Sequence, residues 1–269
     1  MPASGFRTIH VDIADGVGTL TLDRPETFNA MSPEMIGEMT LVFGWLADRA
    51  QLRALILTGD GPAFCSGGDI NTFRAGVESE QIDLPSEVRR GAEALHQAIV
   101  DLRRIPYPVI AAVNGAAAGA GFSLALACDT RIASESAFLA CAYGRIGASP
   151  DGGMSYFLPR VVGPSRALEL LLEDPNMTAA QALEEGLVSE VVAPDELMDR
   201  AREKAAKLAA KAPYYVRMAK QLAGTSIEHT LTEHLQLERH GIADSMATED
   251  LRNGVAAFFG GEKPEFHGR

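Results

Sequence analysis

The sequence predicts an α/β fold on the strength of three observations. Continuous apolar segments at 53–59 and 108–115 each end in glycine, as buried parallel strands often do. A turn of small residues follows each segment, and a helical pattern recurs after the turns. This alternation of strand, turn and helix is typical of βαβ architecture, in which ligands bind where strand ends meet helix starts. Because the chain then becomes largely helical, we expect an α/β core over 1–195 and a helical region over 196–269.

The first elements are a hairpin and a capped helix. Residues 7–13 and 17–23 alternate apolar and polar side chains around a short turn, which predicts two antiparallel strands. Ser32 as N-cap and Pro33 at the first helical position predict a helix start. The apolar face of this helix comprises Met35, Ile36, Met39, Val42, Phe43 and Leu46.

Further along the chain, a polar stretch at 76–85 is a candidate mobile loop. A helix over 86–104, a turn of small residues at 116–121, a helix over 122–128 and a strand over 130–134 follow. From residue 179 onward we expect nearly everything to be helical, including 196–211, 214–223, 227–240 and 248–258.

Composition excludes several function classes. The 269 residues carry a formal net charge of −12 without a basic tract, so we do not expect nucleic acid as a partner. No segment approaches the roughly 20 apolar residues of a membrane span, and no secretory signal precedes the hairpin. We therefore expect a cytoplasmic protein that does not enter a membrane.

The cysteines and histidines suggest no metal centre or disulfide framework. The three cysteines form no CxxC pair, which favours small buried residues over disulfides or zinc ligands. Three histidines of the helical region are too widely spaced for an obvious ligand set. The cysteines are Cys65, Cys128 and Cys141, and the histidines are His229, His234 and His240.

The two turns of small residues are the candidate functional elements. Gly67 and Gly68 precede Asp69 in the first, and 119–121 precede Phe122 in the second. Backbone N–H groups at the first turn of a helix lack intrahelical partners, so two such groups aimed at one carbonyl form an oxyanion hole. Glycines in such turns also serve backbone geometry and close helix packing alone, and local sequence leaves that alternative open.

Four ordered motifs give the sequence a family resemblance. LDRPETFNAMS at 22–32, GPAFCSGGDI at 61–70, PVIAAVNGAAAGAGFSLALACD at 108–129 and GASPDGGMSYFLPRVVG at 147–163 resemble the crotonase superfamily, that is, the enoyl-CoA hydratase/isomerase family. The resemblance implies ββα superhelical turns with a helical C-terminal trimerisation region. It also implies an acyl-CoA thioester substrate, no separate cofactor beyond the coenzyme A of that substrate, and a homotrimer or hexamer.

The resemblance also implies specific site residues. The N–H groups of Gly68 and Ala120 would polarise the thioester carbonyl, with Gly119 and Tyr143 beside the substrate. The adenine of coenzyme A would lie along 63–70, while Arg24 and Lys263 of a neighbouring subunit would meet its phosphates. Within that segment the predicted binding residues are Ala63, Phe64, Ser66, Gly67, Asp69 and Ile70.

The reaction depends on which carboxylates are present. Ser123 and Tyr143 occupy the positions of the two glutamates of the family's hydratases, and neither side chain is a carboxylate base. The remaining acid is Asp151, which local sequence explains equally as part of a Pro-Asp-Gly turn. Family members that lack the glutamates and carry an aspartate here include isomerases. We therefore expect Asp151 to move a proton from C2 to C4 of a 3-enoyl-CoA.

Other interpretations remain beside this one. Asp151 could activate water in a hydratase or hydrolase, or the protein could be a catalytically silent acyl-CoA-binding subunit. The resemblance also includes dehalogenases that use an aspartate at this position, and their sites are expected to carry an activating tryptophan nearby. The single tryptophan, Trp45, lies in the first helix, which disfavours that reaction. Asp69 is interpreted as a helix cap rather than a second base, and His96 as a surface or packed histidine rather than one facing the acyl pocket.

Overall fold

A six-stranded sheet forms the centre of the protein. The computed structural model describes residues 5–49, 51–79 and 81–269. The strand order is β1-β2-β3-β5-β7-β10, and only the β1–β2 pair is antiparallel. The strands are β1 (Ile9–Ala14), β2 (Val17–Leu22), β3 (Ala54–Gly59), β5 (Val109–Val113), β7 (Thr130–Ser134) and β10 (Glu190–Val192).

A second, four-stranded sheet has the order β4-β6-β8-β9. Its strands are short, and only β8 and β9 pair antiparallel. They are β4 (Ala63–Cys65), β6 (Ala116–Ala118), β8 (Phe138–Ala140) and β9 (Met177–Thr178). Each of β4, β6 and β8 directly follows a strand of the large sheet along the chain, which confirms the predicted ββα organisation.

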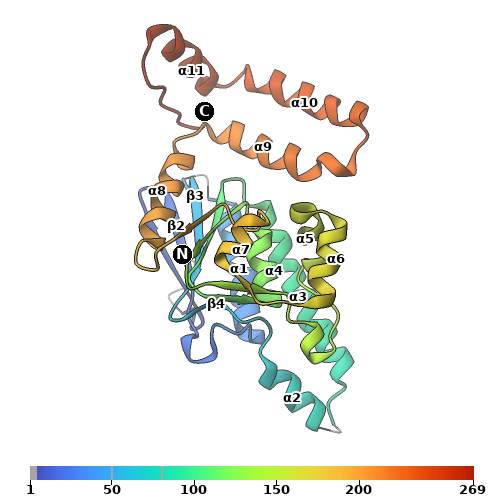
Figure 1. Ribbon diagram of the computed structural model, residues 1–269. Coiled ribbons are helices and arrows are strands. Elements are labelled where there is room, and N and C mark those ends of the chain that lie inside the picture. The colour runs from blue at the N-terminus through green and yellow to red at the C-terminus, as the bar shows by residue number, and fades with distance from the viewer. Residues whose placement is uncertain (1–4, 50, 80) are drawn as a thin grey trace.

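Helices cover the sheets and extend beyond them (Figure 1). The core helices are α1 (Pro33–Ala47), α2 (Ile70–Glu78), α3 (Leu84–Arg104), α4 (Ala120–Ala127), α5 (Met154–Val162), α6 (Pro164–Glu173), α7 (Ala179–Glu184) and α8 (Leu197–Ala209). The last three helices are α9 (Pro213–Thr225), α10 (Leu231–Ser245) and α11 (Glu249–Gly260). Three 3-10 turns lie at Pro25–Thr27, Gly144–Ile146 and Ser226–Glu228.

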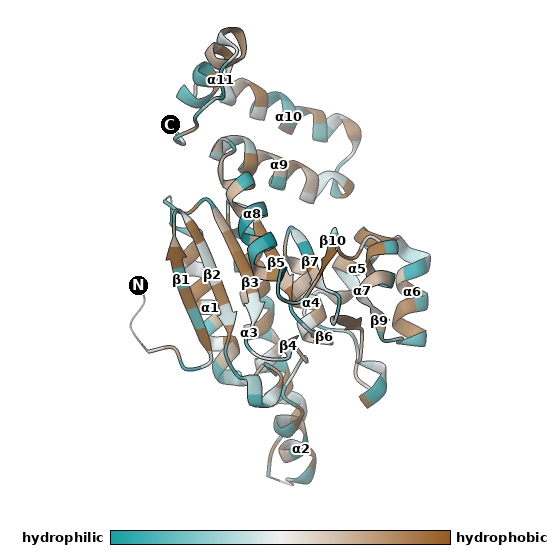
Figure 2. Cartoon of the chain, turned by 60° about the vertical axis from the view of Figure 1, so that its left-hand side comes forward, coloured by the Kyte–Doolittle hydropathy of each residue, from teal (hydrophilic) through white to brown (hydrophobic). Residues whose placement is uncertain are grey.

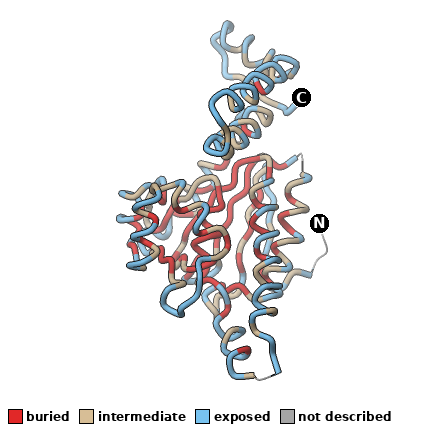
Figure 3. The backbone as a smooth tube through the Cα atoms, turned by 90° about the vertical axis from the view of Figure 1, so that its right-hand side faces the viewer, coloured by how far each residue is buried: buried red, intermediate tan, exposed pale blue. Residues whose placement is uncertain are grey.

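The predicted hairpin and first helix are confirmed. Ser32 Oγ accepts a hydrogen bond from the N–H of Met35 at 3.2 Å, as the N-cap prediction requires. The apolar face of α1 is buried except for Ile36, which is partly buried, and the helix packs beside α3. The three cysteines are buried, as expected. Figures 2 and 3 show that the apolar and buried residues gather on the strands and the inner faces of these helices.

The segment 76–85 is only partly a loop, so that prediction was wrong in extent. The helix α2 runs to Glu78 and α3 begins at Leu84. A Cβ added to Gly76 would come within 2.4 Å of Leu84 Cδ1, so the glycine lets α2 lie directly against the start of α3. The predicted loop is therefore confined to the short connection between Glu78 and Leu84, and its mobility stays a prediction. Likewise, β10 is a strand within the region that we expected to be almost wholly helical.

The C-terminal helices fall into two groups. The helix α8 lies on the large sheet, where Leu197, Ala201 and Ala205 pack against apolar residues of β3, β5 and β7. The helices α9–α11 project from the core (Figure 1). The helix α8 follows the predicted boundary near residue 195 in sequence and packs with the core. That boundary stays a prediction. In the described ranges, we find no helix whose length and apolar character would let it cross a bilayer.

Candidate functional site

The two turns of small residues meet in space. A Cβ built on Gly67 would lie 2.9 Å from the carbonyl oxygen of Ala118 and 3.4 Å from the backbone nitrogen of Ala120. Gly67 has a φ of 105°, which L side chains rarely adopt. Parallel pairing of β4 with β6 places the turns side by side. The glycine at 67 is therefore needed both for backbone conformation and for close approach.

Each turn presents a free backbone donor. In the structure over 5–49, 51–79 and 81–269, the N–H groups of Gly68 and Ala120 have no hydrogen-bond acceptor, although their neighbours do: Asp69 donates to Met31 O, and Gly119 donates to Ala140 O. Ala120 is the first residue of α4, where the helix dipole is positive. This arrangement can bind a negatively charged oxygen.

Asp151 is held by Ser123, which lies three residues after Ala120 in α4. Its backbone carbonyl accepts hydrogen bonds from Ser123 Oγ at 2.8 Å, from Tyr143 OH at 2.8 Å and from Met154 N at 3.1 Å. The carboxyl side chain is 36% exposed, so it is open to solvent. Ser123 and Tyr143 therefore both bind the main chain of the candidate base.

Ser123 and Tyr143 are donors rather than acids or nucleophiles in this arrangement. Each hydroxyl has one hydrogen, and each oxygen lies closer to Asp151 O than to the other hydroxyl, 3.1 Å away. Burial raises the pKa of Tyr143 above its ordinary value, which keeps the phenol protonated. Ser123 is fully buried within α4.

His96 contacts Asp151, and sequence interpretation did not predict this contact. Its side chain is 54% exposed, as a surface histidine would be, but Nε2 lies 2.5 Å from Asp151 Oδ1. The two residues are 55 positions apart, on α3 and before α5, and no local pattern links them. The neighbouring Leu95 could have served as a signal, because it begins the buried face of α3.

A pocket of about 380 Å³ lies beside the first turn. Three of the predicted adenine-binding residues line it, namely Ser66, Asp69 and Ile70, together with Gly68, Glu26, Thr27, Phe28, Ala30 and Asn71. Ala63 and Phe64 lie in β4 with fully buried side chains and are not among the lining residues. Their contact with adenine stays a prediction.

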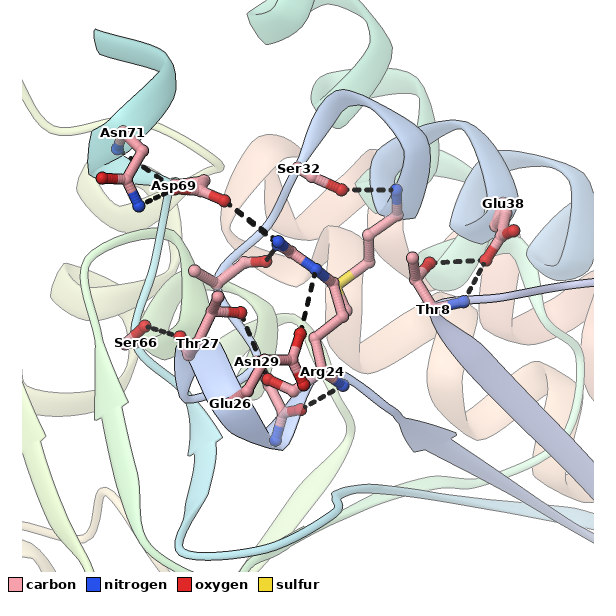
Figure 4. Close-up of polar contacts among 12 residues, drawn as sticks. Thr8, Arg24, Glu26, Thr27, Asn29, Ser32, Glu38, Ser66, Asp69 and Asn71 are labelled. Atoms are coloured by element: carbon pink, nitrogen blue, oxygen red, sulfur yellow. Dashed lines mark hydrogen bonds and ion pairs between the residues drawn. The ribbon is translucent and has the colours of Figure 1, made fainter. Parts of the chain in front are cut away.

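Arg24 lies next to this pocket and is already paired (Figure 4). Both terminal nitrogens of its guanidinium lie 3.2 Å from Asp69 Oδ2. Asp69 Oδ1 in turn accepts from the N–H of Asn71 at 3.1 Å, so the prediction that Asp69 caps a helix is confirmed. The predicted contact of Arg24 with phosphate stays a prediction, and a ligand phosphate there would share the cation with Asp69.

Lys263 lies at the other end of the molecule from this pocket. It is exposed in the tail after α11, whereas α2 beside the pocket lies at the opposite end (Figure 1). The contact of Lys263 with coenzyme A in a neighbouring subunit stays a prediction. Among the residues that the structure describes, no group of three or more histidine, cysteine or acidic side chains could hold a metal ion.

The two sheets and the paired turns define an α/β protein of the crotonase fold class. The family model described as enoyl-CoA hydratase/isomerase matches residues 12–269. A probable enoyl-CoA hydratase of Rhodobacter capsulatus is 38% identical over 98% of this chain and 99% of that protein. The 1,2-epoxyphenylacetyl-CoA isomerase of Escherichia coli is 37% identical over the same shares.

Solved structures agree with these sequence matches. A putative enoyl-CoA hydratase of Streptomyces coelicolor superposes with a TM-score of 0.93 at 34% identity, covering 100% of this chain and 97% of that one. The enoyl-CoA hydratase of Bacillus anthracis gives 0.91 at 35% identity, covering 98% and 100%. The chain belongs to the enoyl-CoA hydratase/isomerase family of the crotonase superfamily, whose members act on acyl-CoA thioesters.

Proposed function

We propose that this enzyme moves the double bond of a 3-enoyl-CoA to give the 2-enoyl-CoA. The observation that carries the proposal is the single carboxylate of Asp151, whose backbone is held by the two residues that stand in place of the hydratase glutamates. One carboxylate suits the movement of one proton between two carbons of the same substrate. Paired carboxylates for adding water are absent from these positions.

The proposed reaction has two proton transfers. Asp151 Oδ2 takes the proton from C2, and the electrons of the C–H bond enter a dienolate whose charge rests on the thioester oxygen. The N–H groups of Gly68 and Ala120 hold that oxygen, and each such donor is typically worth about 2.7–4 kcal/mol in the transition state. The protonated Asp151 then delivers the proton to C4, and the double bond comes to lie between C2 and C3.

Substrate binding follows the same proposal. The coenzyme A adenine lies along the pocket beside Ser66 and Asp69, while Arg24 and Lys263 of a neighbouring subunit meet the phosphates. The step moves a proton and no net electrons, so we propose no cofactor apart from the coenzyme A of the substrate. We also propose a homotrimer or hexamer in the cytoplasm.

Hydration is the second candidate function. The names of two relatives favour it, namely the probable enoyl-CoA hydratase of Rhodobacter capsulatus and the enoyl-CoA hydratase of Bacillus anthracis. In that case Asp151 would activate a water molecule for addition to C3 of a 2-enoyl-CoA. The two functions differ in their substrate, because isomerisation consumes the 3-enoyl-CoA and hydration consumes the conjugated isomer.

The test is to incubate the protein and its Asp151→Asn variant with a medium-chain 3-enoyl-CoA. Appearance of the conjugated thioester is followed by absorbance and the products are confirmed by chromatography. The proposal expects formation of 2-enoyl-CoA by the wild type and a loss of about 100- to 10,000-fold in the variant. Turnover of 2-enoyl-CoA alone supports hydration instead. Unchanged isomerisation by the variant refutes the role of Asp151, and binding without turnover of any thioester supports a silent subunit.

A further inference from the structure

We propose that His96 is a positioning residue that donates a hydrogen bond from Nε2 to Asp151 Oδ1 and thereby leaves Oδ2 as the only proton carrier. This inference rests on the proposed isomerisation. Its starting observation is the 2.5 Å separation of the two atoms. An ionised carboxylate only accepts hydrogen bonds, so the proton of the contact belongs to His96 Nε2.

Both partners of this contact are fixed by the fold. Asp151 is anchored through its carbonyl by Ser123, Tyr143 and the N–H of Met154. His96 follows Leu95, whose buried side chain approaches the site: a Cβ on Gly152 would lie 3.5 Å from Leu95 Cδ2. The contact therefore joins two supported elements, and it restricts rotation of the carboxyl group.

The second carboxyl oxygen is free in this arrangement. Within the described ranges, the side chain of Asp151 hydrogen-bonds through Oδ1 alone, and the partner is His96. Rotation of an unrestrained carboxyl group would exchange the two oxygens and lower the fraction of productive complexes. A fixed Oδ2 can receive the proton from C2 and return it to C4, while the His96 proton stays on Nε2 throughout.

Stability alone does not explain the contact. The two side chains are 54% and 36% exposed, and ion pairs at such exposure contribute little to folding. The expected effect of removing it is therefore on turnover. A hydrogen bond to a charged group is worth enough to change kcat by about 10- to 100-fold.

The test compares three variants of His96 with one control. His96→Gln keeps an N–H at the position of Nε2, His96→Asn carries the same amide on a shorter side chain, and His96→Leu removes it. The matched control is Gln97→Leu, which changes the neighbouring exposed residue of α3 and leaves Asp151 untouched. Asp151→Asn is measured beside them with the same 3-enoyl-CoA.

We expect the Leu and Asn variants to lose about 10- to 100-fold in kcat with KM within about threefold of the wild type. The Gln variant and the control should stay within about fivefold in kcat. Equal urea midpoints of all variants establish that the losses are not caused by unfolding.

The outcomes separate this inference from the proposed function. If Asp151→Asn is inactive while the Leu and Asn variants match the wild type, the inference is overturned and the isomerase proposal stands. Equal losses of kcat in His96→Gln and His96→Asn also overturn it. The longer amide, whose N–H lies at the position of Nε2, would then act no better than the shorter one. If Asp151→Asn isomerises normally, Asp151 is not the proton carrier, so the role of His96 fails with it while the isomerisation itself stands; if the wild type forms no 2-enoyl-CoA, the proposed function fails.

Discussion

Ser123 and Tyr143 each donate a hydroxyl hydrogen bond to the carbonyl of Asp151. Removing either hydroxyl tests whether these residues do no more than hold the Asp151 main chain in place. Three groups donate to that oxygen, namely the two hydroxyls, both at 2.8 Å, and Met154 N at 3.1 Å. A carbonyl oxygen has two lone pairs, so Ser123→Ala or Tyr143→Phe leaves two donors and the carbonyl remains satisfied. The net loss should be about 1 kcal/mol, the usual value of one hydrogen bond. Even if all of it appeared in the transition state, kcat would fall by no more than about tenfold.

The assay measures isomerisation of the 3-enoyl-CoA and urea unfolding for both single variants and the double variant. The double variant leaves only Met154 N on the carbonyl, so its loss of stability should exceed the sum of the single losses. A fall in kcat of more than about 100-fold in either single variant, at unchanged stability, would refute the reasoning. Such a loss is typical of a group that itself carries a proton or attacks the substrate.

Two further predictions concern packing and the thiols. Gly121→Ala would place a Cβ 2.1 Å from the carbonyl oxygen of Cys65, a backbone atom that cannot move aside easily. We therefore expect the free energy of unfolding, measured in urea, to fall by at least about 2 kcal/mol. The control is Gly37→Ala, where a Cβ would meet nothing within 4 Å, and it should be neutral or slightly stabilising. Burial raises the pKa of Cys65 from 9.0 to about 12. Between these values the unfolded chain loses the thiol proton while the folded protein keeps it, so the free energy of unfolding is highest below pH 9.0 and falls as the pH rises toward 12. A thiol reagent at pH 8 should label the unfolded chain rapidly and the folded protein slowly, and rapid labelling of folded protein would contradict the burial.

Local patterns predicted the elements that depend on local contacts. Alternation gave the β1–β2 hairpin, and Ser32 with Pro33 gave the start of α1, because both signals act between residues near in sequence. The strands β6 and β9 have 3 and 2 residues, respectively, and such short segments show no periodicity. Their positions depend on pairing with distant strands, so only the family resemblance anticipated that a second sheet forms.

The candidate site was predictable where it consists of turns. Gly68, Ala120 and Asp151 lie in distinctive motifs, and the structure brings the two turns together. The contact of His96 with Asp151 was not predictable, since it depends on how α3 packs beside the turn before α5. The ion pair of Arg24 with Asp69 likewise joins residues 45 positions apart. Both contacts arise from tertiary packing, which single-sequence patterns do not encode.

The free donors of Gly68 and Ala120 belong to the main chain, and this has a consequence for how the family can diversify. Every residue except proline carries an N–H group, so substitutions at these two positions leave the donor chemistry in place as long as the turn keeps its conformation. The groups that hold the candidate base Asp151, by contrast, are side chains at 96, 123 and 143. Under the proposed mechanism, a few side-chain changes would therefore exchange one reaction for another, while the donors proposed to bind the thioester carbonyl are inherited with the fold itself.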